Sequence, residues 1–441
     1  PAKTKHNEVA PCQHELAPIF DTTNVAIDHN LLTMEMMKKI APKYGLVCLQ
    51  HEKPFEGVNG SGKHNNWSLS TTEENLLDPG DTPMENLQFL VFLAAVIKAV
   101  DEYADLLRTS VATPGNDHRL GANEAPPAVI SIFLGDELTA VLDAIETDTP
   151  YSGTEKTVLK LGVHVLPKFT RDTTDRNRTS PFAFTGNKFE FRMVGSSDSI
   201  ACANIMLNAA MAETLKEFAD RLEGVPDFES ALHDLIKEAI KAHKRIIFNG
   251  NGYDDAWIKE ATEKRGLLNL RTTPDALSTV LEKKNVEMLT SLKIFSEAEI
   301  HSRYEICLEN YCKTVNIEGL TMVDMARKEI LPAVEAYLGD LSGTVAAKTA
   351  AVPGLACKYE KDLISKLSKL ADEISDAASS LDTTLIRLKA IPDVTDAAYV
   401  IRDVVLQKMA ELRVVCDEAE SITADKYWPF PTYGDLLFGV R

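Results

Sequence analysis

Side chains that could bind metal or phosphate gather in five short segments of the first two hundred residues. In the first segment, Glu8 and Glu15 stand on either side of a turn that contains Pro11. Two carboxylates that converge across such a turn could bind one hard cation, because these ions prefer oxygen ligands. Taken alone, the pair also fits two solvated surface residues.

The second segment, residues 57–68, is rich in glycine and asparagine. It nearly matches the phosphate-binding pattern GxxxxGK followed by serine or threonine, but His64 occupies the position that needs a hydroxyl group. That pattern also requires a helix directly after the loop, whereas residues 65–70 are typical of a strand. We therefore predict no P-loop. The glycines would let backbone amides approach a substrate, and His64 would be available as a ligand, with a plain hairpin loop as the alternative.

Two further segments are polar loops that contain arginine. Residues 116–127 are closed by two prolines and are expected to form an ordered lid that presents Arg119 and Glu124. A hydrated connector is the alternative. Residues 175–180 contain two arginines, the second of them Arg178, whose forked donors suit polyphosphate oxygens. Two solvated arginines are the alternative there.

The fifth segment, residues 188–193, has the alternation of a strand. One face would carry Phe189, Phe191 and Met193. The other face would carry Lys188, Glu190 and Arg192. The apolar face is expected to join the core, which leaves a carboxylate and a guanidinium group side by side. An exposed ion pair is the common explanation for such a strand.

The elements that must position these segments change character along the chain. Strand-like runs, loops and a few helices fill the sequence up to about Ser197, and the rest is almost entirely helical. A helix is predicted to begin at Thr82 as N-cap, with proline in its first turn. A second capping box begins at Ser296. Residues 197–219, rich in alanine, are expected to form a helix packed closely against another element.

The last hundred residues are predicted to form a helical hairpin. Small residues at 343–354 indicate a joint. Apolar positions at helical spacing then run through residues 358–390 and 393–423, which Pro392 separates. The tail from Trp428 contains two prolines and is expected to pack back as an extended segment.

The bulk composition excludes several classes of function. The chain has 441 residues, 44% hydrophobic and 26% charged, which is ordinary for a soluble globular protein of two or three domains. A formal net charge of −19 argues against nucleic acid or an anionic membrane as the main partner. The longest apolar run is too short to span a bilayer. Seven scattered cysteines suit a reducing cytosol, so we expect a cytoplasmic protein.

In order and spacing, the five segments resemble the signature of the glutamine synthetase family. Residues 5–20 resemble its metal-binding strand, and Asn59-Gly60-Ser61-Gly62-Lys63-His64 is similar to its NGSGxH loop. Asn177-Arg178 and Phe189-Glu190-Phe191-Arg192 resemble its late nucleotide and metal segments. The variants at 62–68 and 119–127, the helical C-terminus and the ending at 428–438 look like the type III branch. The resemblance covers essentially the whole chain.

The resemblance implies a role for each candidate residue. Glu8 and Glu15 would bind a metal near glutamate, and His64 and Glu190 a metal near the ATP phosphates. Asn59 and Gly60 would hold the backbone groups of glutamate, with Arg119 and Arg192 on its carboxylate side. Glu124 would close over the site and help to deprotonate ammonium, while Arg178 would face the phosphates. Phe20, Ser68 and Lys188 would line the nucleotide pocket.

The resemblance also implies a fold and an assembly. The family fold is α+β, with a curved, mainly antiparallel sheet flanked by helices, followed here by a largely α-helical C-terminal region. We expect an N-terminally incomplete catalytic domain at 1–345, and a helical hairpin with an extended tail at 346–441. Family members form dodecameric double rings with active sites between neighbouring subunits. The N-terminal β-domain and two further metal-binding glutamates of the family have no counterpart in this sequence. We therefore expect the 441-residue chain to be inactive by itself.

The activity implied is ATP-dependent ligation of ammonia to glutamate through γ-glutamyl phosphate, with two Mg²⁺ or Mn²⁺ ions. One departure from the family is the missing second arginine after Asn177-Arg178. Two alternatives stay open. One is a ligase of the same fold that uses another amine, and the other is a non-catalytic fragment or assembly-only relative.

Overall fold

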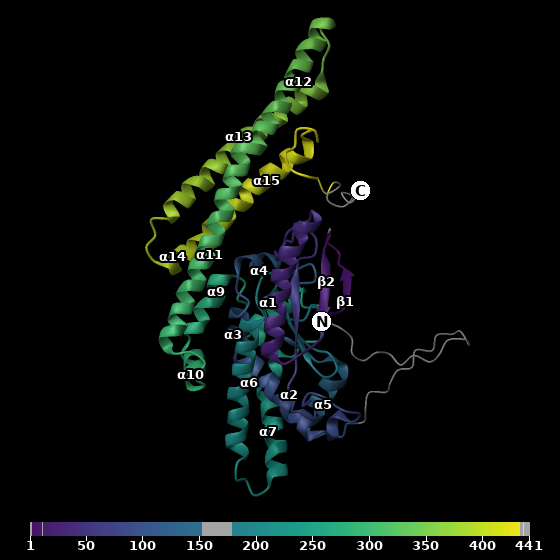
Figure 1. Ribbon diagram of the computed structural model, residues 1–441, viewed down its shortest axis with the longest axis vertical. Helices are drawn as coiled ribbons and strands as arrows, with labels where there is room; N and C mark the ends of the chain where they lie inside the picture. The colour runs from purple at the N-terminus through teal and green to yellow at the C-terminus, as the bar shows by residue number, and fades with distance from the viewer. Residues whose placement is uncertain (1, 11, 152–178, 433–434, 436–441) are drawn as a thin grey trace, which may run out of the picture. The chain divides into compact units, whose positions relative to one another are not determined.

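The computed structural model describes residues 2–10, 12–151, 179–432 and 435 (Figure 1). It divides into two compact units, Pro1–His301 and Ser302–Arg441. The first unit combines strands and helices, and the second consists of helices and their connections. The predicted α+β class, with a helical C-terminal region, is confirmed.

The first unit begins with a β-hairpin. Strand β1 (Ala2–Asn7) pairs antiparallel with β2 (His14–Pro18). The turn between them closes through the backbone N–H of Glu8, which donates to the carbonyl of Gln13 at 2.9 Å. Cys12, in this turn, has a left-handed φ of 53°. Helix α1 (Thr23–Ile40) follows and buries none of its residues in the described chain.

A four-stranded sheet lies at the centre of the first unit. Its strands are β3 (Gly62–Trp67), β6 (Phe189–Gly195), β5 (Phe182–Phe184) and β4 (Ile132–Phe133), in that order. Among the described strands of this sheet only the β4–β5 pair is parallel, so the mainly antiparallel sheet predicted from the family is confirmed. A strand directly follows the glycine-rich loop, which also confirms that the loop is no P-loop.

Helices pack against this sheet through an aromatic core. Helix α2 (Leu87–Glu102) lies beside α6 (Ala201–Leu222) and α7 (Phe228–His243), as Figure 1 shows. The ring of Phe89 on α2 lies 6.0 Å from that of Phe184 on β5. Phe182 and Phe189 stack at 4.7 Å across the sheet. Aromatic pairs of this kind add to the free energy gained from burial.

The predicted start of α2 needs a correction. Thr82 does not cap this helix: residues Pro83–Glu85 form a short 3-10 turn, and Asn86 is the N-cap. The Asn86 side chain accepts a hydrogen bond from the backbone N–H of Phe89 at 3.0 Å. Asparagine is as good an N-cap as threonine, and Pro83 fits either arrangement, so the sequence alone could not decide between them.

The remaining elements of the first unit are short. Between α2 and β5 these are α3 (Ala104–Thr109), α4 (Pro114–Arg119) and α5 (Gly135–Thr147). After α7 they are α8 (Asp255–Lys259), α9 (Thr273–Ser278) and α10 (Lys283–Ser291). Helix α4 matters most for the candidate site, because it ends at Arg119.

The second unit is an antiparallel arrangement of long helices. Helix α11 (Glu297–Met325) crosses the boundary between the units, and a π-helical turn joins it to α12 (Leu331–Ala351). Helix α13 (Lys358–Leu388) packs along α12 and α15 (Leu406–Ile422), with α14 (Val394–Val400) between α13 and α15. The predicted capping box at Ser296 is confirmed, because its hydroxyl and N–H both bond Glu299 at 2.8 Å.

The helical hairpin of the last hundred residues is confirmed, including the break at Pro392. The joint is shorter than predicted, since α12 remains helical through Ala351 and only residues 352–357 are irregular. The predicted domain boundary at 345/346 therefore lies inside α12, and the division into domains 1–345 and 346–441 stays a prediction. Among the described residues, no helix combines the length and the apolar character needed to cross a membrane.

Candidate active site

The β1–β2 hairpin brings Glu8 and Glu15 together with His6. The strand register places His6 opposite Glu15, and Glu8 follows two residues later. The Nε2 atom of His6 lies 2.5 Å from Oε1 of Glu8 and 2.9 Å from Oε2 of Glu15. One ligand atom from each residue falls within 4.8 Å of the other two. Two carboxylate oxygens and an imidazole nitrogen in this arrangement fit one divalent cation.

His6 is a residue that the sequence reasoning missed. Its signal was present, because positions 6 and 8 share one face of a strand with period two. The prediction for the first segment considered carboxylates alone and so assigned no role to the imidazole of His6.

Glu190 and Arg192 form the second cluster, on strand β6. Arg192 donates from Nε and Nη2 to Oε2 of Glu190, at 3.2 and 3.1 Å. Their side chains are only 3% and 2% exposed, so the alternative of an exposed surface pair is wrong. Phe189, Phe191 and Met193 are buried as predicted, and Glu190 and Arg192 on the charged face are buried as well, whereas Lys188 is half-buried.

His64 lies beside this pair on the neighbouring strand. Its Nδ1 atom is 3.9 Å from Oε2 of Glu190. The β3–β6 register shifts between Lys63 and Asn65, so His64 occupies the irregular position of β3. Such irregularities change the direction of a side chain, and His64 is 44% exposed while Glu190 is buried. The imidazole thus links a buried carboxylate to solvent.

The glycine-rich loop rests on the side chain of Arg119. A Cβ atom added at Gly62 would overlap the Arg119 guanidinium group, and one at Gly60 would lie 3.1 Å from its Cγ. Only glycine therefore permits the close approach at position 62. Asn59 is half-buried in the same loop.

Arg119 is not presented by a lid, which corrects the sequence prediction. It is the last residue of α4 and only 5% exposed. Its Nη2 donates to the carbonyl of Arg192 at 2.9 Å, and its Nη1 donates to Oδ1 of Asn116 at 3.0 Å. Burial lowers the pKa of Arg119 to about 10. Arg119 thus holds the end of β6 against the glycine-rich loop.

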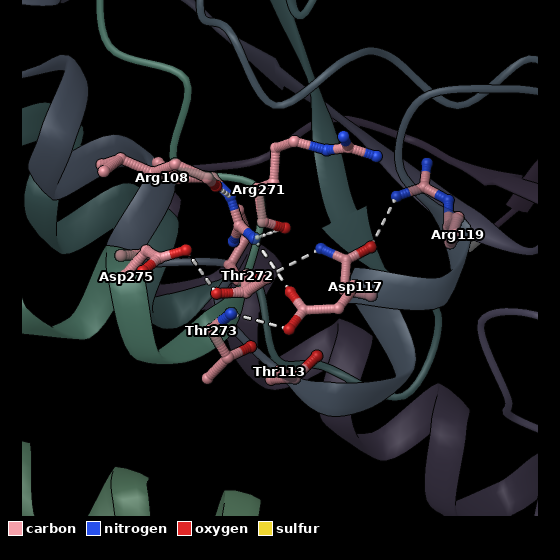
Figure 2. Close-up of polar contacts among 12 residues, drawn as sticks. Arg108, Thr113, Asp117, Arg119, Arg271, Thr272, Thr273 and Asp275 are labelled. Carbon is pink, nitrogen blue, oxygen red and sulfur yellow. Dashed lines mark hydrogen bonds and ion pairs between the residues drawn. The ribbon is translucent and has the colours of Figure 1, made fainter. Parts of the chain in front are cut away.

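Helix α4 is fixed in place by a second polar network (Figure 2). The Asp117 carboxylate accepts from Nη2 of Arg108 at 2.9 Å and from the backbone N–H of Thr273 at 2.6 Å. Burial raises the pKa of Asp117, while the charge of Arg108 opposes this shift. Asn116 donates to the carbonyls of Val111 and Met193. These bonds orient the six-residue helix that ends in Arg119.

The loop after α4 carries Glu124 in a strained conformation. Asn123 and Glu124 have left-handed φ values of 53° and 68°. The loop closes through the N–H of Gly121, which donates to the carbonyl of Pro126 at 3.0 Å. Glu124 is exposed, so this part of the predicted lid does present its carboxylate. Strained residues of this kind cluster at functional sites.

Tyr253 is a further residue that the sequence reasoning missed. Burial raises its pKa, the charge of Glu124 adds to the shift, and the charges of Arg119 and Arg192 oppose it. The phenol therefore lies within electrostatic reach of three predicted site residues. Its loop is held by the N–H of Gly252, which donates to the Thr179 hydroxyl at 2.7 Å.

The predicted nucleotide residues are brought together only in part. The Ser68 hydroxyl bonds Oδ1 of Asn75 at 2.7 Å and the carbonyl of Asn187 at 3.1 Å, which places it beside Lys188. Phe20 is 94% exposed just after β2. Arg178 lies outside the described residues.

Lys63, the apparent P-loop lysine, is bound to backbone carbonyls that follow β6. Its ammonium group donates to the carbonyls of Ser196 and Asp198, both at 2.6 Å. Burial lowers its pKa to about 8.

A cavity of about 520 Å³ lies beside α3, outside the clusters above. Among its lining residues are Asp101, Asp105, Arg245 and Lys284. These charges are already paired: Arg245 with Asp101 and Lys284 with Asp105, both at 2.9 Å. None of the described candidate residues lines this cavity.

Comparison with known proteins shows which family the chain resembles. The model described as glutamine synthetase, catalytic domain, matches residues 1–128, and the glutamine synthetase C-terminal domain model matches residues 231–349. The chain is 48% identical to a glutamine synthetase of Butyrivibrio fibrisolvens, over 100% of the chain and 63% of that protein. It is 44% identical to the Type-3 glutamine synthetase of Dictyostelium discoideum, over 99% of the chain and 60% of that protein. It is also 44% identical to a glutamine synthetase of Bacteroides fragilis, over 99% of the chain and 62% of that protein. The chain thus spans about three fifths of the length of these relatives.

Proposed function

The chain belongs to the glutamine synthetase family, and from this premise we propose that the intact protein forms glutamine from glutamate and ammonia, converting ATP to ADP and phosphate. The likeness to the Type-3 relative over 99% of the chain agrees with the type III variants at residues 62–68 and 119–127. Because the chain covers only about three fifths of these relatives, the activity is proposed for the intact protein rather than for these residues alone.

One hydrogen bond supports this proposal most directly. Gln13, in the turn between Glu8 and Glu15, donates from Nε2 to the carbonyl oxygen of Gly60 at 3.0 Å. A cluster suited to a divalent cation therefore adjoins the loop proposed to hold glutamate. Transfer of a phosphoryl group to a carboxylate requires the cation and the glutamate at one place, because the reaction depends on positioning and on charge neutralisation.

The proposal includes two divalent cations, Mg²⁺ or Mn²⁺, of which the hairpin cluster fits one. Glu8 and Glu15 would hold the first, and the geometry adds His6 to them. His64 and Glu190 would hold the second. When bound, such ions neutralise the charge of phosphate oxygens.

In the first step, an oxygen of the glutamate γ-carboxylate attacks the γ-phosphorus of ATP. The bond to the bridging oxygen breaks, its electrons leave with ADP, and γ-glutamyl phosphate forms. Asn59 and Gly60 would orient glutamate, and Arg119 and Arg192 would act on its carboxylate side. Arg178 would face the phosphates. Phe20, Ser68 and Lys188 would line the nucleotide pocket.

In the second step, the nitrogen of ammonia attacks the acyl carbon and phosphate leaves. Ammonium must lose a proton before this attack and the amide nitrogen loses another after it, so a carboxylate near the acyl group is required. Glu124 would accept a proton here, because its loop presents the carboxylate to solvent close to Tyr253. Closure of this loop would exclude water, which would otherwise hydrolyse the acyl phosphate.

A glutamine-formation assay on the intact protein tests the proposal. We expect glutamine only when glutamate, ammonium, ATP and a divalent cation are all present. Glu124→Ala is expected to leave ATP binding intact and to reduce glutamine formation about a hundredfold, within the usual range for loss of a general base. No glutamine from the wild-type protein would refute the function. A product with alkylamines but not with ammonia would favour the alternative amine ligase.

We also propose a cytoplasmic homo-oligomer, a dodecameric double ring as in the family. None of the seven cysteines forms a disulfide in the described chain, which suits a reducing compartment. Helix α1 supports an oligomer, because Leu32, Met36 and Met37 are 60%, 43% and 42% exposed on an element that buries none of its residues.

A further inference from the structure

We propose that Glu52 is a positioning residue that sets the geometry of the glutamate-binding loop and of Arg119; this inference rests on the function proposed above. Glu52 is 3% exposed and precedes the glycine-rich loop. It belongs to none of the five segments singled out from the sequence, and it carries none of the roles implied by the family.

The backbone of Glu52 holds the loop directly. Its carbonyl oxygen accepts a hydrogen bond from the N–H of Ser61 at 2.8 Å. The same oxygen lies so close to Gly60 that a Cβ atom there would be only 2.5 Å away. Any shift of Glu52 therefore displaces the residue proposed to hold the backbone groups of glutamate.

The side chain of Glu52 joins the loop to two other elements. Its Oε1 accepts from the backbone N–H of Ser197 at 2.8 Å and from the Ser197 hydroxyl at 2.6 Å. A Cβ atom at Gly195 would lie 2.5 Å from Oε1, and one at Gly115 would overlap Oε2. The carboxylate thus fills a slot between the end of β6 and the start of α4, and a side chain at Gly115 or Gly195 would require it to move.

The charges around this slot are balanced. Two cations, Lys63 and Arg119, face two carboxylates, Glu52 and Asp198, and the charge of Glu52 acts on the other three groups. Removal of the Glu52 charge leaves Asp198 alone with two cations, the buried Arg119 and the half-buried Lys63. Arg119 would then move towards Asp198, or part of its positive charge would lack a compensating negative charge, because buried charges require partners.

Glu52 should therefore affect glutamate more than ATP. Its contacts reach the loop of Asn59 and Gly60 and the helix that carries Arg119, all on the glutamate side. Ser68 and Lys188, proposed for the nucleotide, lie elsewhere, around Asn187. A purely structural role would instead change the KM values for glutamate and ATP together, or change stability alone.

The test is Glu52→Gln in the intact protein, which keeps the backbone bonds and the shape but removes the charge. We expect the KM for glutamate to rise about tenfold or more, while the KM for ATP stays within about twofold. Titration calorimetry with glutamate should show the same loss of affinity. The matched control is Asp101→Asn, which removes a carboxylate that is 7% exposed and paired with Arg245 and His243. The control should lower the melting temperature and leave both KM values within about twofold.

An unchanged KM for glutamate in Glu52→Gln, or equal increases for both substrates, would overturn the inference. If that variant fails to fold, Ser197→Ala decides, because it removes only the hydroxyl bond to Oε1 and should raise the KM for glutamate selectively by a smaller factor. A wild-type protein that forms no glutamine would refute the proposed function, and the inference with it.

Discussion

Glu190 and Arg192 form an ion pair on β6 in which both side chains are almost completely buried, with Oε2 of Glu190 3.1 Å from Nη2 of Arg192. Residues two positions apart in a strand can pair in this way, because their side chains project from the same face. A buried pair of this type gains little over an apolar pair, yet it is costly to break. Its presence beside His64 therefore favours a role in the site over a role in stability alone.

Removal of one partner should show this cost. Glu190→Gln is expected to reduce the free energy of unfolding by about 3 kcal/mol, because it removes the negative charge that pairs with the buried Arg192 guanidinium. Asp220→Asn is the control, since it breaks the exposed Lys216–Asp220 pair and should leave the free energy of unfolding nearly unchanged. Urea unfolding measures both variants. Equal small effects would show that other groups compensate the Arg192 charge.

His6 should contribute to metal affinity. His6→Ala is expected to weaken Mn²⁺ binding about tenfold or more, because it removes one of three convergent ligand atoms. Titration calorimetry with Mn²⁺ alone measures this without any need for turnover. His14→Ala changes an imidazole of the same hairpin outside the cluster and should bind Mn²⁺ normally. Normal affinity in His6→Ala would leave Glu8 and Glu15 as the only ligands from this hairpin.

A side chain at Gly62 should displace Arg119. Gly62→Ala would place a methyl group on the Arg119 guanidinium, so Arg119 must move and the bonds to β6 must change. We expect glutamine formation to fall about tenfold or more. Gly339→Ala is a fitting control, because it lies within α12 with open space around it and should be neutral or slightly stabilising. Full activity in Gly62→Ala would exclude a close loop–Arg119 contact from the mechanism.

Asp198 should make stability depend on pH. Burial, together with the charge of Glu52, raises its pKa from 3.8 to about 6. Between these values the folded protein holds a proton that the unfolded chain has lost, so the contribution of Asp198 to stability decreases as pH rises from about 4 to 6. The loss relative to Asp198→Asn is expected to be about 1 to 3 kcal/mol. Unfolding curves of both proteins at pH 4 and pH 7 measure it, and parallel pH dependences would contradict the assignment.

Local patterns predicted the elements well wherever a single stretch of chain decides the outcome. The strand after the glycine-rich loop, the alternation of Phe189 and Phe191, and the capping box at Ser296 all depend on neighbours within a few residues. The pairing of Glu190 with Arg192 followed from the same alternation, but its burial did not, because that depends on helices distant in sequence.

The misses share a different cause. Arg119 is polar and lies in a polar stretch, so the sequence favoured an exposed lid. In the structure its guanidinium group instead donates to carbonyls of β6 that are over seventy positions away. Glu52 carried no local pattern at all. Its partners Gly115, Gly195 and Ser197 come from two other segments, and only their convergence reveals the slot. Roles that arise from convergence cannot be inferred from spacing.

The slot around Glu52 limits the order in which this region can change during evolution. While the carboxylate fills the slot, a larger residue at position 115 or 195 would collide with it. Such a residue requires the side chain at position 52 to move or to become smaller, and at position 195 Asp198 must also move, because its Oδ2 lies 2.7 Å from the added Cβ. A smaller residue at 52, in turn, removes both hydrogen bonds to Ser197. We therefore expect the residues at positions 52, 115 and 195 to vary together among relatives.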